Sequence, residues 1–313
     1  MSIENQMRVS VVGMGPVGST LAAHLIEAGA FVVPCDILHD KIDKIKEDGI
    51  RLEYTIQKHV KVEEACYSIE ELKKYDLDLI VISVKTPNLG KVLELASDLA
   101  SEKLYVMSAQ NGIDNEVEVA KFFGEEKTLR MVINYAGNMI DLNTVHVSFF
   151  NPPNYVASLM PRGEEIAKKF AEMLNSVGLT TEIPDDIQDY VWEKAILNAA
   201  LSAICAITHR TMKEVMDFPQ TVELVEAIID ESVHVAEKEG IDLGENFRHF
   251  CIQYLKNAGH HKPSMLVDIE NGLLTEIDSL NGKIVDYGRK HNIPTPINFC
   301  VTALIHLLEH YME

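Results

Sequence analysis

The stretch Met7-Arg-Val-Ser-Val-Val-Gly-Met-Gly-Pro-Val-Gly18 places three glycines directly after a short apolar run. A helical pattern, Ser19 to Ala28, follows, and a second apolar run, Phe31 to Val33, ends near Asp36. This order predicts a strand, a glycine-rich turn, a helix and a second strand. The stretch therefore indicates the first β-α-β unit of a doubly wound sheet.

The glycine turn is expected to hold the pyrophosphate of a dinucleotide. Gly13 permits the tight turn, Gly15 lets backbone amides approach the phosphates, and Gly18 lets helix and strand pack closely. The helix N-terminus adds partial positive charge at the same place. The expected cofactor-binding residues of this turn are Gly13, Met14, Gly15, Pro16, Val17 and Gly18. The alternative is a structural turn that binds no phosphate.

Asp36 bears on which dinucleotide is bound. An acid about 20 residues past the glycines accepts hydrogen bonds from the adenosine ribose and repels a 2′-phosphate. The residues that follow contain no Arg, although His39 and Lys41 offer some positive charge. Asp36 therefore favours NAD as the cofactor over NADP. The alternative is that Asp36 only caps the next helix.

Length and composition limit the class of protein. A chain of 313 residues is too long for one small core, so two domains are expected. Its formal net charge of −20 disfavours nucleic-acid and anionic-membrane partners. No apolar stretch is expected to reach the roughly 18 residues of a membrane span, and the N-terminus lacks a signal-peptide pattern. Five scattered cysteines without a C-x-x-C motif fit a reducing, cytoplasmic location and no bound metal.

The pattern of secondary structure changes once along the chain. Before Ile183-Pro-Asp-Asp186, strands are expected at 50–62, 77–84, 104–107 and 129–136, with helices at 39–48, 89–99 and 163–177. Runs 145–150 and 155–159 are expected to form an antiparallel hairpin on the sheet edge. After the break, helices are expected at 187–207, 218–239, 246–256, 265–291 and 296–310. The expected fold is α/β: a Rossmann-type doubly wound domain at 1–184 and an all-α domain at 185–313.

A polar face on the first of these later helices suggests catalysis. Lys194, Asn198 and Ser202 lie four residues apart and so share one face of an otherwise apolar helix. Reduction of a ketone requires a proton donor near the developing alkoxide, and the helical domain should supply it. Glu276, in an unusual helix stretch from Asn271 to Gly282, could hold this lysine charged. The alternatives are a lysine that extends to solvent and an ordinary surface acid.

Five further motifs accompany the glycine turn: Val84-Lys85, Gln110-Asn111-Gly112, Trp192-Glu-Lys194 with Asn198, Pro263-Ser264-Met265, and Thr275-Glu276-Ile-Asp278 with Asn281-Gly282. With these motifs the chain resembles the ketopantoate reductase family of two-domain reductases over nearly its full length. The resemblance implies that Lys194 is the general acid on the keto oxygen and that Glu276 orients it. It also implies that Ser264 holds the substrate carboxylate, although Ser264 alone could equally be an N-cap for a helix beginning at Met265. The other implied contacts are Asn111 and Asn198 to the substrate or nicotinamide, and Lys85 beside the cofactor.

The chain departs from the family pattern at several polar positions. Ser202 stands where a second Asn is usual, His261 where an Asn precedes Ser264, and Asp36 replaces the basic residue of NADP-using members. The stretch 208–212 also lacks the usual Asn-Gly-Glu type of sequence. Ser202 and His261 thus remain candidate substrate contacts with different chemistry. Fewer polar anchors should weaken binding of ketopantoate's hydroxyl and favour an apolar side chain.

The expected function is an NAD-dependent reductase that converts bulky or branched 2-keto acids into D-2-hydroxy acids. The D configuration is implied by the resemblance only. The alternatives are ketopantoate reduction in pantothenate biosynthesis and, from another class, a non-catalytic nucleotide sensor. The expected partner is a small 2-keto or 2-hydroxy acid, and the last helices could form the face of a homodimer.

Overall fold

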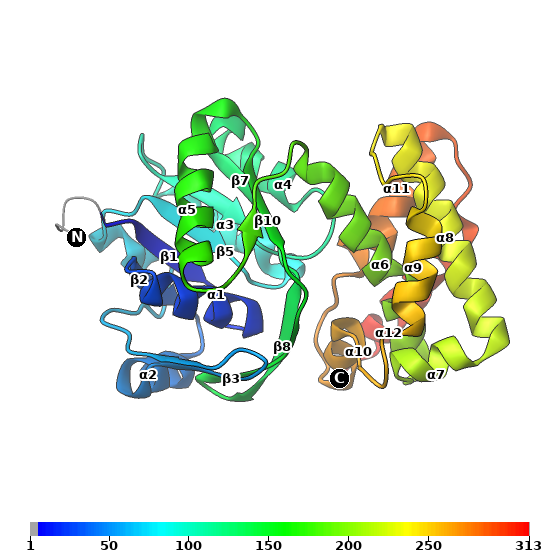
Figure 1. Ribbon diagram of the computed structural model, residues 1–313, viewed down its shortest axis with the longest axis horizontal. Helices are drawn as coiled ribbons and strands as arrows, with labels where there is room; N and C mark the ends of the chain where they lie inside the picture. The colour runs from blue at the N-terminus through cyan, green and yellow to red at the C-terminus, as the bar shows by residue number, and fades with distance from the viewer. Residues whose placement is uncertain (1–5, 313) are drawn as a thin grey trace. The chain divides into compact units, whose positions relative to one another are not determined.

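The computed structural model describes residues 6–312 of the chain (Figure 1). Contacts divide it into two compact units. The first comprises the chain up to Gln110 together with Asn115–Ile187, and the second comprises Asn111–Asp114 together with Gln188–Glu313. The main division thus falls between residues 187 and 188, whereas the sequence pattern placed it after residue 184. The sequence pattern did not indicate that Asn111–Asp114 belongs with the second unit.

The first unit contains a seven-stranded, mostly parallel sheet, as expected for a doubly wound fold. Its order is β11-β10-β7-β6-β5-β1-β2, and only the β7–β10 pair is antiparallel. Val12 pairs with Cys35 and with Ile82, so β1, β2 and β5 end at the same edge. The strands are β1 (Arg8–Val12), β2 (Phe31–Cys35), β5 (Leu79–Ile82), β6 (Tyr105–Ser108), β7 (Thr128–Val132), β10 (Asn154–Ser158) and β11 (Thr181–Glu182).

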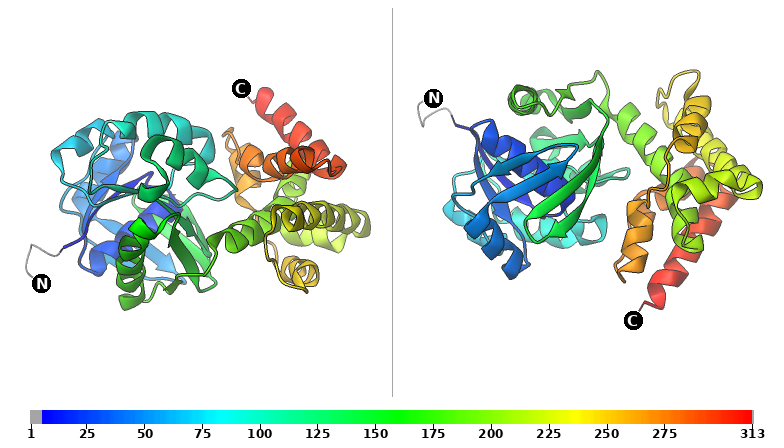
Figure 2. Two further views of the ribbon diagram at one scale, coloured as in Figure 1. Left: turned by 90° about the horizontal axis from the view of Figure 1, so that it is seen from above. Right: turned by 60° about the horizontal axis from the view of Figure 1, so that its bottom comes forward.

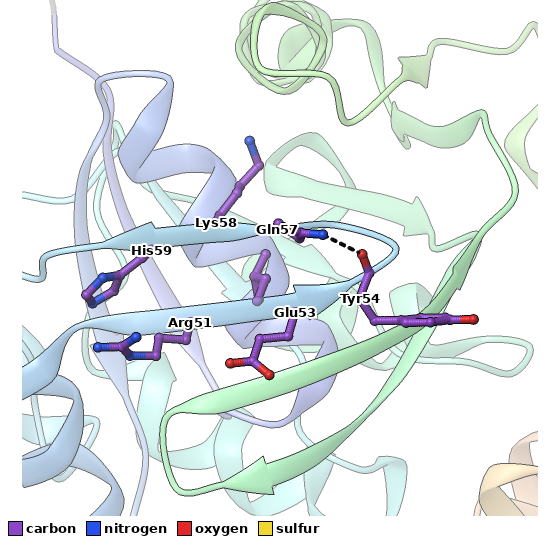
Figure 3. A pocket seen from close by; sticks show the side chains of 7 residues that line it. Arg51, Glu53, Tyr54, Gln57, Lys58 and His59 are labelled. Carbon is purple, nitrogen blue, oxygen red and sulfur yellow. Dashed lines mark hydrogen bonds between the residues drawn. The ribbon is translucent and has the colours of Figure 1, made fainter.

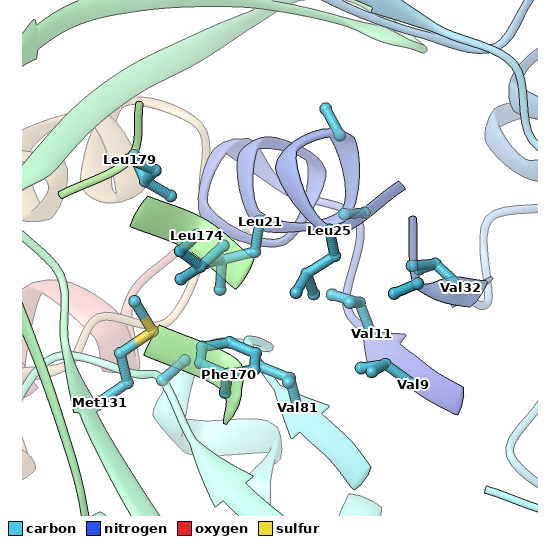
Figure 4. Packing of buried hydrophobic residues seen from close by; sticks show 14 of the residues in the cluster. Val9, Val11, Leu21, Leu25, Val32, Val81, Met131, Phe170, Leu174 and Leu179 are labelled. Atoms are coloured by element: carbon cyan, nitrogen blue, oxygen red, sulfur yellow. The ribbon is translucent and has the colours of Figure 1, made fainter. Parts of the chain in front are cut away.

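Helices cover both faces of this sheet, which explains why its strands read as continuous apolar runs. Leu21 and Leu25 of α1 pack with Phe170 and Leu174 of α5 on one face (Figure 4). Burial of each such side chain contributes about 2 kcal/mol to folding. The helices are α1 (Pro16–Glu27), α2 (His39–Asp48), α3 (Leu89–Ser97), α4 (Asn115–Phe123) and α5 (Glu164–Ser176), with 3₁₀ turns at Glu70–Lys74, Thr86–Asn88, Glu125–Lys127 and Pro161–Gly163.

A second sheet of four strands, in the order β4-β3-β9-β8, packs on the other side of α1 (Figure 2). Its strands are β3 (Ile50–Tyr54), β4 (Lys58–Val60), β8 (Tyr135–Asp141) and β9 (Thr144–Phe150). The expected hairpin of runs 145–150 and 155–159 is therefore wrong, because β9 pairs with β8 and β10 pairs with β7 in the other sheet. The expected single strand 129–136 is likewise two strands, β7 and β8.

The connections between the sheets explain these two corrections. Asn151 donates its backbone N–H to the carbonyl of Asn134 at 2.7 Å, and the side chain of Asn154 accepts from the N–H of Asn134 at 2.8 Å. The segments that connect β7 to β8 and β9 to β10 thus run side by side. At this point the chain passes from the seven-stranded sheet into the four-stranded sheet after β7, and it returns after β9. Two neighbouring prolines, Pro152 and Pro153, cannot donate backbone hydrogen bonds at this crossing.

The second unit is helical, which confirms the expected fold class. Its helices are α6 (Ile187–Thr208), α7 (Met212–Asp217), α8 (Pro219–Glu239), α9 (Phe247–Lys256), α10 (Ser264–Glu270), α11 (Asn281–His291) and α12 (Pro296–His310). The sequence analysis expected no apolar stretch long enough to span a membrane, and this expectation is wrong. By length and composition alone, α6 is long and apolar enough to do so. Since 67 % of its most apolar window is buried within the protein, α6 has the character of a core helix.

The expected single helix 265–291 is also wrong. α10 ends at Glu270, a turn at Asn271-Gly272 follows, and a 3₁₀ turn at Ile277–Ser279 precedes α11. An Asn-Gly pair is a strong turn signal, and here it outweighs the apolar periodicity. Glu276 therefore lies in a connection between helices and not on a helix. The sequence analysis also missed α7, although Thr211 and Glu214 form its capping box.

Candidate functional site

The glycine turn joins β1 to α1 as expected, and its three glycines differ in their surroundings. Gly13 has a φ of +95°, and a Cβ there would lie 2.8 Å from the backbone N of Val84. A Cβ on Gly18 would lie 2.0 Å from the carbonyl oxygen of Gly13. At Gly15 a Cβ would meet nothing within 4 Å. Gly13 and Gly18 are thus required by the fold, whereas Gly15 leaves the open approach that a phosphate group needs.

Asp36 is bonded directly to this turn. Its Oδ2 accepts a hydrogen bond from the N–H of Met14 at 2.8 Å, and its Oδ1 accepts from the N–H of Leu38 at 3.0 Å. Lys41 Nζ donates to the carbonyl of Met14 at 3.1 Å and lies 3.7 Å from Asp36 Oδ2. The N-cap residue of α2 is Leu38, so the alternative that Asp36 caps this helix is wrong. The sequence analysis noted the charge of Lys41 but did not place it beside Asp36.

The carboxyl end of β5 supports the same turn. Ser83 Oγ lies 2.8 Å from the carbonyl of Gly13 and 3.2 Å from that of Val12, to which it can donate. Lys85, two residues on, is half-buried at the start of the 3₁₀ turn Thr86–Asn88. Ser83 was not among the expected site residues; its position at the end of a strand beside the glycines was the available signal.

In the second unit, α6 carries Lys194 and Asn198 half-buried and Ser202 buried at 4 % exposure. Asn281 Nδ2 donates to the carbonyl of Ala199 at 3.1 Å, so the start of α11 lies beside this part of α6. Asn281 is fully buried, and it also donates to Asn298 Oδ1 at 3.0 Å. The connection that contains Glu276 is thereby held next to the helix that contains Lys194 and Asn198.

The segment Asn111–Asp114 lies against the same connection. The N–H of Ile113 donates to the carbonyl of Ser279 at 2.8 Å. A Cβ on Gly112 would lie 2.4 Å from Ser279 Oγ, so only glycine allows this close approach. Asp114 accepts from Tyr287 at 2.9 Å and pairs with Lys283 at 2.8 Å. Within the second unit, the Asn111 turn and the Glu276 connection are thus brought together by backbone contacts, and Glu276 is only 7 % exposed.

His261 lies in a loop that is hydrogen-bonded to α7, and Ser264 begins the helix that follows this loop. The carbonyl of His261 accepts from the N–H of Met212 at 3.0 Å, and burial lowers the pKa of its imidazole, which favours the neutral ring. Ser264 is exposed and is the first residue of α10, whose N-cap is Pro263. The alternative of Ser264 as an N-cap for a helix beginning at Met265 is therefore wrong.

A separate hollow lies on the β3–β4 hairpin of the first unit (Figure 3). Gln57 Nε2 donates to the carbonyl of Tyr54 across its end at 3.4 Å. The hollow is lined by Arg51, Leu52, Glu53, Tyr54, Gln57, Lys58 and His59, and it includes no expected site residue. Among residues 6–312, no group of three or more His, Cys, Asp and Glu side chains is arranged to hold a metal ion.

Comparison with known proteins matches both units. The family model "Ketopantoate reductase PanE/ApbA" matches residues 9–157, and the model "Ketopantoate reductase PanE/ApbA C terminal" matches residues 186–309. The chain is 28 % identical to a 2-dehydropantoate 2-reductase of Aquifex aeolicus over 309 residues, which cover 96 % of each chain. It is also 28 % identical to a 2-dehydropantoate 2-reductase of Pyrococcus abyssi over 300 residues, covering 96 % of this chain and 97 % of the relative.

Solved structures agree with these matches. A D-mandelate dehydrogenase in a ternary structure with NADH and anilino(oxo)acetate is similar with a TM-score of 0.87 and 27 % identity, covering 98 % of this chain and 99 % of that one. A PanE/ApbA-family ketopantoate reductase from Ralstonia eutropha shares the fold with a TM-score of 0.88 at 24 % identity, with 98 % and 99 % coverage.

Proposed function

The chain belongs to the ketopantoate reductase family, and we propose that it reduces a bulky or branched 2-keto acid with NADH to the D-2-hydroxy acid. The coarser class, a nicotinamide-dependent oxidoreductase acting on a 2-keto acid, follows from the family. The substrate, the choice of NADH and the roles of individual residues are the proposal. We also propose that the enzyme is cytoplasmic and that its partner is a small-molecule substrate.

Lys194 is the proposed proton donor. The nicotinamide cofactor supplies the hydride when bound, and the developing alkoxide then needs a proton and a positive charge nearby. An ammonium provides both, and it offers local attraction for an anionic acid on a chain of net charge −20. Glu276, at 7 % exposure, is proposed to keep Lys194 charged and oriented. Asn111, Asn198 and Ser264 are the proposed polar contacts of the substrate.

Ser202 is the observation that carries the proposed substrate class. It continues the face of Lys194 and Asn198, and it is 4 % exposed between apolar neighbours of α6. A serine hydroxyl reaches less far than the asparagine amide that the family resemblance implies there. Without that amide, the site has no partner for the distal hydroxyl of a substrate such as ketopantoate. It therefore discriminates less against a 2-keto acid with an apolar side chain. The D-mandelate dehydrogenase relative, which was solved with NADH and anilino(oxo)acetate, supports this choice.

NADH is proposed because an acid stands at the end of β2. Asp36 is held against Met14 of the glycine turn, and no arginine lies between residues 36 and 41. A carboxylate there favours a free ribose 2′-hydroxyl over a 2′-phosphate.

We further propose that the protein forms a homodimer through the exposed apolar residues of α12, which are Phe299, Leu304 and Leu307. Size-exclusion chromatography with light scattering tests this proposal.

A substrate and cofactor panel tests the main proposal. Oxidation of NADH and of NADPH is followed with ketopantoate, 2-ketoisocaproate and benzoylformate. We expect the highest kcat/KM with NADH and one of the two latter acids, and a D-configured product on chiral chromatography. Ketopantoate with NADPH as the best pair would establish ketopantoate reduction, which the names of the curated relatives favour. No turnover with any 2-keto acid would favour a nucleotide sensor.

A further inference from the structure

A buried polar chain in the first unit ends at Gln110, just beyond β6. Glu116 of α4 and Arg130 of β7 form an ion pair with Nε 3.3 Å from Oε2, and their side chains are 1 % and 3 % exposed. Arg130 Nη1 donates to Ser108 Oγ at 2.9 Å, and Ser108 Oγ donates to Gln110 Oε1 at 2.7 Å. The polar chain therefore crosses from α4 through two strands to one amide side chain.

The chemistry of this polar chain determines how the amide of Gln110 is oriented. A guanidinium can only donate, so the Ser108 hydroxyl must accept from Arg130. The single hydroxyl hydrogen of Ser108 is then left for Gln110, and the atom that receives it must be the amide oxygen. The NH₂ group of Gln110 consequently occupies the other position, and it cannot exchange with Oε1 without losing this bond.

The NH₂ group of Gln110 has unused donors. Gln110 is 6 % exposed, and within residues 6–312 its Nε2 has no hydrogen-bond acceptor. A buried donor without a partner costs about 1–3 kcal/mol, so such a group points to a ligand that supplies an acceptor. Gln110 also lies at the carboxyl end of β6, the edge where doubly wound sheets bind their ligands.

Strand order identifies which part of a dinucleotide reaches Gln110. The glycine turn follows β1, and Asp36 follows β2, so the adenosine half lies on the β2 side. In the order β6-β5-β1-β2, the other half must extend over β5 towards β6. Two strand spacings amount to about 10 Å, which matches the reach of a nicotinamide riboside beyond the pyrophosphate. A Cβ on Gly15 would meet nothing within 4 Å, so the glycine turn itself is open where the pyrophosphate is expected.

We propose that Gln110 is a cofactor-binding residue whose Nε2 donates to the carboxamide oxygen of the nicotinamide ring. Ser108, Arg130 and Glu116 are positioning residues that keep the NH₂ group directed at the cofactor. This inference rests on the proposed use of a nicotinamide dinucleotide, and it adds a residue that recognises the ring itself. It also gives a role to the buried Glu116–Arg130 ion pair of the first unit, which the proposed proton transfer does not use.

Binding of NADH and of ADP-ribose to Gln110→Leu tests the inference. ADP-ribose contains the adenosine, pyrophosphate and ribose but lacks the nicotinamide ring. We expect calorimetry to show an NADH Kd raised about tenfold in Gln110→Leu, with the ADP-ribose Kd unchanged. Gln110→Glu should weaken NADH binding at least as much, because Oε1 still accepts from Ser108 while the donor becomes an acceptor. Gln57→Leu, the same change at an exposed glutamine of the first unit, is the matched control.

Ser108→Ala tests the positioning role, because it frees the amide without removing it. Its NADH Kd should rise about threefold, again with the ADP-ribose Kd unchanged. Equal losses for NADH and ADP-ribose in Gln110→Leu, or no loss for either, would overturn the inference and leave Gln110 a purely structural residue. Wild-type protein that binds ADP-ribose but neither NADH nor NADPH would instead overturn the proposed function, and this inference with it.

Discussion

The ammonium of Lys41 lies 3.7 Å from Oδ2 of Asp36, and both side chains are 11 % exposed. The two residues bond to opposite sides of Met14, Lys41 through the carbonyl and Asp36 through the N–H. A negative and a positive charge therefore stand together at the end of β2. The acid opposes a 2′-phosphate, and the cation would attract one if the acid were neutral.

Replacing the acid alone should change the cofactor preference. In Asp36→Asn the amide oxygen can still accept from Met14, so this bond to the glycine turn is retained, while the bond from the N–H of Leu38 is lost and Lys41 keeps its charge. We expect the ratio of kcat/KM for NADPH over NADH to rise at least about tenfold, equivalent to about 1.4 kcal/mol. The double variant Asp36→Asn with Lys41→Met should lose most of that rise. Asp40→Asn, a nearby exposed acid, is the control. An unchanged ratio in Asp36→Asn would refute the role of Asp36.

Removal of the proposed proton donor should affect chemistry and not cofactor binding. We expect Lys194→Met to lower kcat at least about 100-fold, as is typical for loss of a general acid. The NADH Kd, measured by fluorescence titration, should stay within about twofold of wild type. Lys213→Met, which removes an exposed lysine paired with Asp217, should leave kcat unchanged. A near-normal kcat in Lys194→Met would show that another group protonates the substrate.

Alanine substitutions at two glycines of the turn should have different effects, one on cofactor binding and the other on stability. Gly15→Ala adds a methyl group to open space at the phosphate approach, so the NADH Kd should rise about tenfold with a small change in Tm. Gly18→Ala drives a methyl group into the carbonyl of Gly13 and should lower Tm clearly more. Gly90→Ala, in α3 with nothing within 4 Å, should raise Tm slightly and leave binding intact. Equal NADH affinity in wild type and Gly15→Ala would contradict the phosphate role of this turn.

Acid should destabilise the first unit through His24. Burial lowers the pKa of His24 from 6.5 to about 4, and its Nδ1 lies 2.7 Å from the carbonyl of Thr20. Between these pH values the unfolded state binds more protons than the folded state. Stability is therefore full above pH 6.5 and falls as the pH approaches 4, by about 3 kcal/mol in total. The urea midpoint of His24→Leu should fall less between pH 7.5 and 4.5 than that of wild type. In the control His249→Leu, at an exposed histidine, the urea midpoint should change with pH as it does in wild type. If the midpoint of His24→Leu also falls as much as that of wild type, His24 is excluded as the cause.

Local patterns predicted a large part of this molecule. The strand, turn and helix around Gly13–Gly18 and the polar face of α6 formed at the expected residues, and the expected family and fold class are confirmed. These features depend on residues within one or two turns of each other. The roles of Lys194, Glu276 and the substrate contacts remain predictions.

The failed predictions of secondary structure have two kinds of cause. The hairpin expected at 145–159 was a reasonable local pattern, but β9 and β10 found better partners in two different sheets. The apolar periodicity from Met265 to His291 continued across the Asn271-Gly272 turn, and α7 was too short to be noticed. Contacts with distant strands outweighed the local pattern at β9 and β10, whereas the other two misses had local signals, the Asn271-Gly272 turn and the capping box of Thr211 and Glu214.

By itself the sequence determined the glycine turn between β1 and α1, because glycine backbone freedom and apolar runs are local properties of the chain. Only the tertiary structure decided that Lys41 stands beside Asp36, that Asn111–Asp114 packs with Ser279, and that Arg130 and Ser108 orient Gln110. Asp36 and Lys41 are five residues apart and meet through the turn into α2, whereas the other pairings join residues that are far apart along the chain or on separate strands. They exist because strand order and helix packing bring them together, and neither is encoded in local spacing.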